Sequence, residues 1–157
     1  MTQADVSYTG DVTDVRTISM LVEPGPYNRL WQPFIAPWTE GHLVVAFGAQ
    51  LTGKVDMGDI LCSVSTDDGD TWEEPVMVLD HRVALGPIRF AYANSVLYLP
   101  PGHDVVWCYA MRSPLYYRDS EDSQLCAVYS ADGGRSWQPV ELAVHYHSPL
   151  ITNAGVV

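Results

Sequence analysis

One eight-residue motif occurs twice in the sequence. It reads Ser-x-Asp-x-Gly-x-[Thr/Ser]-Trp at Ser65–Trp72 and again, 65 positions later, at Ser130–Trp137. Asp can bind backbone N–H groups further along the chain, Gly accepts a positive φ, and the Ser and Thr hydroxyls close the turn. The Trp adds a large apolar surface that anchors the strand that follows. Two copies in phase predict a repeat fold that uses the same hairpin turn twice.

Short apolar segments surround both motifs. Around the first motif they lie at residues 43–49, 59–65 and 75–79. Around the second they lie at residues 93–99, 104–111, 124–130 and 139–144, with a turn at 100–102 and a polar loop at 112–123. Segments of this length with alternating or β-branched residues are typical of strands. About four antiparallel strands per repeat predict an all-β fold, a β-propeller of four-stranded antiparallel blades.

The repeat predicts how the chain is divided. We expect an N-terminal lead-in, a first blade, a second blade and the start of a third blade at residues 1–26, 27–80, 88–144 and 148–157. Propellers have typically 4–8 blades, so two blades and part of a third leave blade faces that need partners. Either further C-terminal blades complete the ring, as the apolar ending at 151–157 favours, or several copies form a homo-oligomer.

Charge and hydropathy limit the partners. The net charge is −11 and Lys54 is the only lysine, which argues against binding to nucleic acid or to anionic membranes. The sequence contains no run of 18 apolar residues, so it predicts no transmembrane helix. Residues 1–17 are polar and acidic, unlike a signal peptide, so we expect a cytoplasmic protein.

The cysteines and the absence of cofactor motifs limit which disulfides, metals and cofactors we expect. Cys62, Cys108 and Cys126 each lie in an apolar run, which predicts buried structural thiols rather than disulfides or a metal site. The sequence has no nucleophile elbow around a Ser and no phosphate-binding Gly loop. We therefore expect neither a metal nor another cofactor.

Both motifs resemble the Asp-box, or BNR repeat, of the sialidase (neuraminidase) superfamily. Other segments resemble the openings and strands of that family's first three blades, and they lie at residues 32–35, 43–47, 94–98, 125–130 and 152–155. The resemblance covers residues 27–157 and implies the N-terminal part of a six-bladed catalytic propeller. It also implies that the box residues are structural and lie away from the substrate; these are Ser65, Asp67, Gly69, Trp72, Ser130, Asp132, Gly134 and Trp137. A calcium loop is the alternative for residues 67–70, although the ligand spacing and terminal Glu of an EF-hand loop are missing.

The resemblance also implies where catalytic groups would lie. Family sialidases use an Asp of the first blade as general acid/base, a Tyr–Glu pair as nucleophile and three arginines that hold the substrate carboxylate. Asp56 lies where the acid/base Asp is expected, while Trp31 and Leu51 occupy two arginine positions. Arg29 is two residues from the first of these, on the same face of an extended strand. The Tyr–Glu pair and the other arginines are expected beyond Val157, and the departures argue against sialic acid itself as substrate.

The residue types support these candidates, and each has an alternative. Asp56 lies in a Gly-flanked loop, of the kind that carries function, and the alternative is a solvated turn Asp beside Lys54. Arg29 with Trp31 could bind a carboxylate and stack on a sugar, and the alternative is a surface Arg beside a packed Trp. Arg112 belongs to an Arg- and Tyr-rich loop at 112–118 that could contact a glycan, or that could be an ordinary Tyr-rich rim.

Two further groups complete the candidates. Tyr117 lies in the 112–118 loop and is a possible glycan contact. His145 and His147 point to one face if the chain is extended there, and they could bind substrate, pair on a metal or transfer protons. An exposed pair without function is the alternative.

The sequence therefore favours a sialidase-like, carbohydrate-active propeller. The expected reaction is exo-type hydrolysis of a glycan or glycoside, with Asp56 as proton donor. One alternative is a carbohydrate-binding propeller assembled from several chains. Another is a polysaccharide lyase that uses His145 or His147 with Tyr117.

Overall fold

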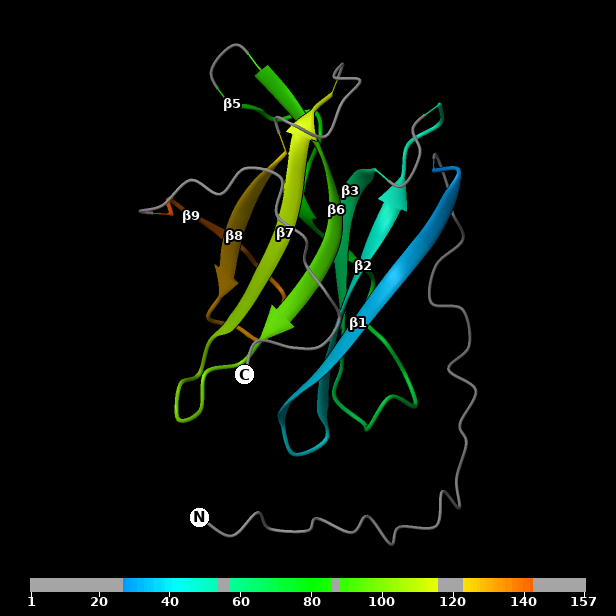
Figure 1. Cartoon of the computed structure of the whole chain (residues 1–157). Helices are drawn as coiled ribbons and strands as arrows, with labels where there is room; N and C mark the ends of the chain where they lie inside the picture. The colour runs from blue at the N-terminus through cyan, green and yellow to red at the C-terminus, as the bar shows by residue number, and fades with distance from the viewer. Residues whose placement is uncertain (1–26, 54–56, 86–87, 116–122, 143–157) are drawn as a thin grey trace, which may run out of the picture.

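The computed structural model describes residues 27–53, 57–85, 88–115 and 123–142, which form nine β-strands (Figure 1). These are β1 Arg29–Thr39, β2 His42–Gln50, β3 Gly58–Ser65, β4 Val76–Leu79, β5 Ala84–Leu85, β6 Ile88–Tyr98, β7 Val106–Pro114, β8 Gln124–Ser130 and β9 Gln138–Val140. Neighbouring strands pair antiparallel, which confirms the all-β prediction. Within these residues, no helix has the length and apolar character needed to cross a membrane.

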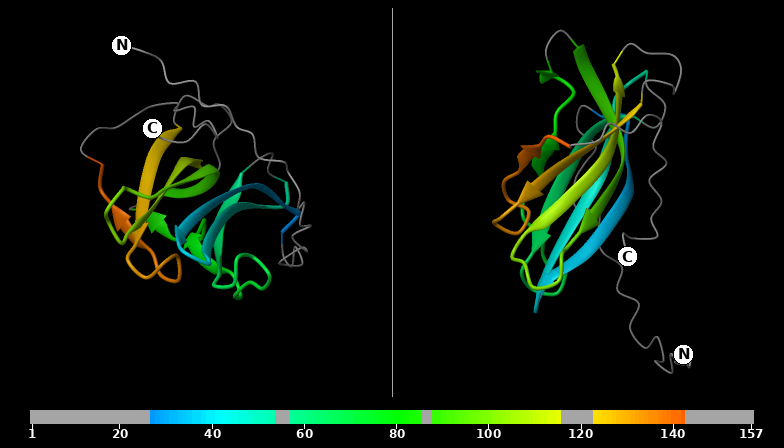
Figure 2. Two further views of the ribbon diagram at one scale, coloured as in Figure 1. Left: turned by 90° about the horizontal axis from the view of Figure 1, so that it is seen from below. Right: turned by 60° about the vertical axis from the view of Figure 1, so that its left-hand side comes forward.

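The strands form two four-stranded meanders. Blade 1 consists of β1 to β4 and blade 2 of β6 to β9, each paired in sequence order. Among the described residues, the sheet ladder continues from one blade to the other through one pair, Gly58 with Tyr92. Seen from below, they lie side by side as two separate groups of strands (Figure 2, left). The described sheet does not close on itself, as expected for part of a propeller.

The main core lies between the blades. It combines apolar residues from one face of each blade; the largest group is Ala36, Val44, Ala46, Ile60, Cys62, Phe90, Tyr92, Val106, Cys108, Cys126 and Val128. The three cysteines are free and buried there, as predicted. Burial raises the pKa of Cys62 to about 12, so this thiol stays protonated. These thiols therefore serve as small packing groups.

The first strand of each blade is interrupted in the same way. The pairing register shifts between Trp31 and Phe34 in β1, and between Ala93 and Val96 in β6. Gln32 (φ 47°) and Asn94 (φ 53°) adopt the left-handed conformation at these places. Such bulges bend a strand and increase its twist. The repeat therefore includes the irregular first strand of each blade as well as the motif.

Both eight-residue motifs form the same turn. In the first, Asp67 accepts hydrogen bonds from the Ser65 hydroxyl (2.8 Å), the Thr71 N–H (2.8 Å) and the Thr71 hydroxyl (2.6 Å). The Trp72 indole N–H donates to the Gly69 carbonyl at 3.1 Å. The second turn repeats this pattern with Ser130, Asp132, Gly134, Ser136 and Trp137. The carboxylates of Asp67 and Asp132 are thus occupied within their own turns.

Candidate functional site

Polar side chains gather at the strand ends opposite the two turns, the upper end in Figure 1. The turns follow β3 and β8 at the other end. The side chains come from the start of β1, the end of β2, the start of β3, the end of β7 and the start of β8, and they are Arg29, Gln50, Asp59, Arg112 and Gln124. Both blades therefore contribute to one polar end, which we call the upper end.

Arg29 is oriented by a buried glutamine on the neighbouring strand. Arg29 and Gln50 are directly opposite each other in the β1–β2 ladder. The Arg29 Nε–H donates to Gln50 Oε1 at 2.5 Å, and the Gln50 side chain is buried. The Gln50 carbonyl also accepts the Asn28 N–H at 2.8 Å. An exposed guanidinium is thus held in one direction by a fixed amide.

Blade 2 contains a second Arg–Gln pair at the same end. Arg112 lies opposite Gln124 in the β7–β8 ladder and donates to Gln124 Oε1 from Nε (3.2 Å) and Nη2 (2.9 Å). Its guanidinium lies 4.9 Å from the centre of the Phe90 ring, a cation–π contact. The prediction of a loop starting at residue 112 is wrong, because β7 continues to Pro114. Arg112 and Ser113 remain in the strand because their side chains bind Gln124 and Ser123 on the β8 side.

Trp31 packs within blade 1. It lies opposite Gly48 in the ladder, and a Cβ at residue 48 would lie 2.4 Å from Trp31 Nε1. That indole N–H is buried and finds no hydrogen-bond partner among the described residues. Arg29, two residues earlier, lies on the same face of β1. The glycine therefore makes room for the indole on the face of β1 that also carries Arg29.

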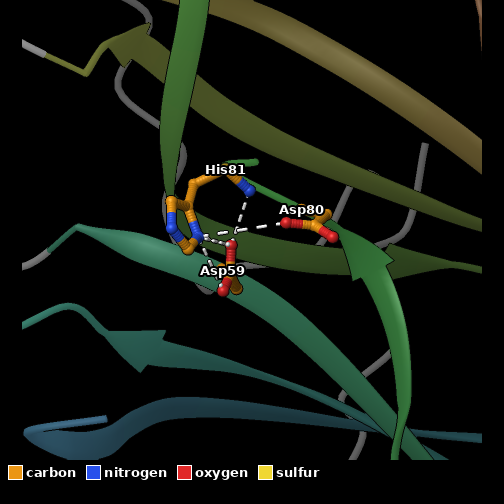
Figure 3. A group of neighbouring side chains, drawn as sticks. All are labelled: Asp59, Asp80 and His81. Atoms are coloured by element: carbon orange, nitrogen blue, oxygen red, sulfur yellow. Dashed lines mark hydrogen bonds and ion pairs between the residues drawn. The ribbon is translucent and has the colours of Figure 1, made fainter. Parts of the chain in front are cut away.

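A buried carboxylate connects β3 to the segment after β4 (Figure 3). Asp59, only 1% exposed, accepts the Tyr27 hydroxyl at 2.8 Å and the His81 backbone N–H at 2.6 Å. The His81 ring nitrogen Nδ1 lies 2.8 Å from the same carboxylate. Burial and the contact with Asp59 raise the pKa of Tyr27 well above its ordinary value, so Tyr27 remains a donor. These residues are not among the candidates that the sequence predicts, because their one signal is a carboxylate at the start of an apolar strand.

The same group has the residue types of a metal site. Ligand atoms of Asp59, Asp80 and His81 lie within 4.8 Å of one another. However, Arg82 binds both carboxylate oxygens of Asp80, at 2.8 and 2.9 Å, and lowers the pKa of Asp80. Tyr27 and His81 already donate to Asp59. The carboxylate oxygens that could bind a metal therefore already accept hydrogen bonds from protein groups. The arrangement is a hydrogen-bond network.

A cavity of about 750 Å³ lies between the outer strands of the two blades. Its lining is mainly apolar, with Asp80, Tyr92, Arg112 and Glu141 as polar members. Burial raises the pKa of Tyr92 to about 12, so its hydroxyl is uncharged. Cavities of this size with a few polar groups are typical of small-molecule sites. Arg112 thus lines a space large enough for a sugar.

Four predicted site residues lie outside the described residues. These are Asp56, Tyr117, His145 and His147. Asp56 belongs to the connection between β2 and β3, whose described ends are closed by the Leu51 N–H donating to the Met57 carbonyl at 3.2 Å. β2 ends at Gln50, the partner of Arg29 in the ladder, and β3 begins at Gly58, so the two strands flanking this connection meet it at the upper end.

Comparison with known proteins shows the fold. No family model and no curated protein matches the sequence. Among solved structures, the chain is similar to the Hadza microbial sialidase Hz136, with a TM-score of 0.65 and 19% identity over 73% of this chain and 26% of that one. It is also similar to Trypanosoma rangeli sialidase in complex with sialic acid, with a TM-score of 0.53 and 19% identity over 74% of this chain and 21% of that one. The chain spans about a quarter of the length of these structures. Its fold is therefore that of part of a sialidase-like β-propeller.

Proposed function

We propose that the chain is part of a carbohydrate-active propeller that hydrolyses a glycan from its end, with the sugar bound at the upper end. The observation that carries this proposal is the repeated Arg–Gln pair, Arg29 with Gln50 and Arg112 with Gln124. A guanidinium fork suits a carboxylate, so the substrate class is a glycan that carries an acidic sugar. The likeness of the fold to sialidases supports the same class of ligand.

In this proposal Asp56 is the proton donor. In sequence it lies between the end of β2 and the start of β3, which are both at the upper end, while Asp67 and Asp132 are occupied in turns at the other end. Asp56 would protonate the glycosidic oxygen as the bond to the sugar breaks. Trp31, packed on Gly48, occupies the position where the family resemblance expects an arginine. We therefore favour an acidic sugar other than sialic acid.

Hydrolysis of aryl glycosides tests this function. The protein would be assayed on 4-nitrophenyl glycosides of glucuronic acid, N-acetylneuraminic acid and neutral sugars. We expect Asp56→Asn to lower kcat/KM by at least about 100-fold, with a larger loss for a poorer leaving group than 4-nitrophenol. Asp104→Asn, which removes an exposed carboxylate between β6 and β7, is the matched control. Unchanged turnover of Asp56→Asn would refute the assignment.

A second candidate is a glycan-binding propeller assembled from several chains. It is favoured by an aromatic cluster on the face of blade 2 that points away from the core. The rings of Trp107 and Tyr109 are stacked with their centroids 6.1 Å apart, and the centroid of the Tyr129 ring lies 5.8 Å from that of Trp107. A second copy could cover this face. A defined trimer in solution with sugar binding but no hydrolysis would favour this candidate, and an active monomer would exclude it.

A further inference from the structure

The Asp59–His81 contact fixes one nitrogen of the imidazole ring. Asp59 accepts the His81 backbone N–H at 2.6 Å and lies 2.8 Å from Nδ1 (Figure 3). A carboxylate can only accept, so Nδ1 carries the hydrogen and a neutral ring has its lone pair at Nε2. Tyr27 holds the other oxygen of Asp59 at 2.8 Å. The carboxylate, itself 1% exposed, thereby holds the imidazole in one tautomer.

Nε2 is the available nitrogen of this ring. The His81 side chain is 21% exposed, and the part of the chain that the structure describes offers Nε2 no hydrogen-bond partner. The charged groups next to the ring are two carboxylates, Asp59 and Asp80, and Asp80 is itself paired with the Arg82 guanidinium. Because Arg82 neutralises one of the two carboxylates, one negative charge remains to balance an imidazolium formed at His81.

The ring is not needed to close its own loop. The Val83 N–H donates to the Asp80 carbonyl at 3.1 Å, and the Arg82 N–H to Asp80 Oδ1 at 2.8 Å. The His81 backbone N–H already ties this loop to Asp59. The contact of Nδ1 with Asp59 comes in addition, and its specific effect is on the direction and tautomer of the imidazole.

We infer that His81, oriented by Asp59, is a general base of the upper end. In the step it performs, an O–H bond of water or of a bound hydroxyl breaks. The proton moves to Nε2, and the electron pair stays on the oxygen that attacks the substrate. The imidazolium is paired with Asp59 and afterwards releases the proton to solvent. The reaction that the base serves rests on the proposed function, whereas the orientation of His81 does not.

Two measurements test the inference. Long-range ¹H–¹⁵N spectra of the protein at neutral pH should show His81 as the Nδ1–H tautomer, and diethyl pyrocarbonate should acylate its Nε2. Exposed His103, in the turn between β6 and β7, is the reference for both. His81→Asn keeps a donor toward Asp59 but removes Nε2. We expect this variant to fold normally and to lose about 100-fold or more in kcat/KM on the aryl glycoside that the wild type cleaves. His103→Asn should leave kcat/KM unchanged.

The outcomes separate this inference from the proposed function. An Nε2–H tautomer, or a His81 that stays unmodified after His103 has reacted completely, would overturn the inference whatever the enzyme does. An active wild type with unchanged kcat/KM in His81→Asn would show that the ring only ties the loop. A wild type that cleaves none of the glycosides would instead contradict the proposed hydrolase.

Discussion

The indole of Trp38 in blade 1 packs against Gly133 in blade 2 and fills the space that any side chain at that position would need. A Cβ at Gly133 would lie 1.1 Å from Trp38 Cζ3, and Gly133 has a φ of +73°. Beside it, a Cβ at Gly134 would lie 3.0 Å from Val44 Cγ1. The second turn thus docks on blade 1 through its two glycines. In the first turn, Asp68 holds the position of Gly133 with a φ of 56°.

Gly133→Ala should therefore destabilise the protein strongly. The added methyl group meets both an aromatic ring and an unfavourable backbone conformation, which together cost about 2–4 kcal/mol of unfolding free energy. Gly102→Ala is the matched control, because φ is +76° there and nothing lies within 4 Å of the new Cβ. It should cost about 1 kcal/mol. Urea unfolding compares the two, and equal losses would contradict the docking role of Gly133.

Asp132 should make stability dependent on pH. Burial acts to raise its pKa, but hydrogen bonds from Ser136 and Ser130 prevail and lower the pKa from 3.8 to about 2. A lowered pKa in the folded state means that this stabilisation is present above about pH 4 and is lost as pH falls through about 2. Because the side chain is exposed, solvent screens the effect, and Asp132→Asn should cost only about 1 kcal/mol at pH 7.

Unfolding of the wild type and Asp132→Asn at several pH values provides the measurement. The difference in unfolding free energy between them should shrink as the pH approaches 2. Asp104→Asn controls for the loss of one negative charge. A difference that stays constant from pH 7 to pH 2 would be incompatible with this account of the turn.

The ion pair between the blades should contribute little. Arg135 of the second turn contacts Glu73, with side chains that are 42% and 45% exposed. A double-mutant cycle with Arg135→Ala and Glu73→Ala should give a coupling below about 1 kcal/mol that falls with added salt. A coupling of several kcal/mol, insensitive to salt, would show that this pair rather than the glycine contact holds the second turn on blade 1.

The strands around the motifs could be predicted from sequence, and the irregular ones could not. The sequence predicts the segment 124–130 as a strand with the bounds that β8 has, because it is short, apolar and leads directly into a motif. The strand β1 was missed because Pro33 and Pro37 lack N–H groups and Gln32 breaks the alternation. The end of β7 was missed because Ser113 looks like a loop residue but is buried against Ser123.

Only part of the candidate site could be predicted. Arg29 and Arg112 were identified by residue type, but their glutamine partners depend on strand register. Asp59 and His81 are 22 residues apart and meet only after β3 and β4 pair, so no local pattern indicates their contact. A network formed by tertiary structure leaves little trace in a single sequence.

The central claim is that a glycan binds at the upper end and not at the turns. Hydrogen–deuterium exchange measured with and without glucuronic acid or N-acetylneuraminic acid, each at saturating concentration, tests it most directly. The account predicts slower exchange in peptides that contain Arg29, Gln50 and Arg112, and no change at 65–72 or 130–137. Slower exchange in the two turns would contradict the claim. So would unchanged exchange in every segment with both acidic sugars.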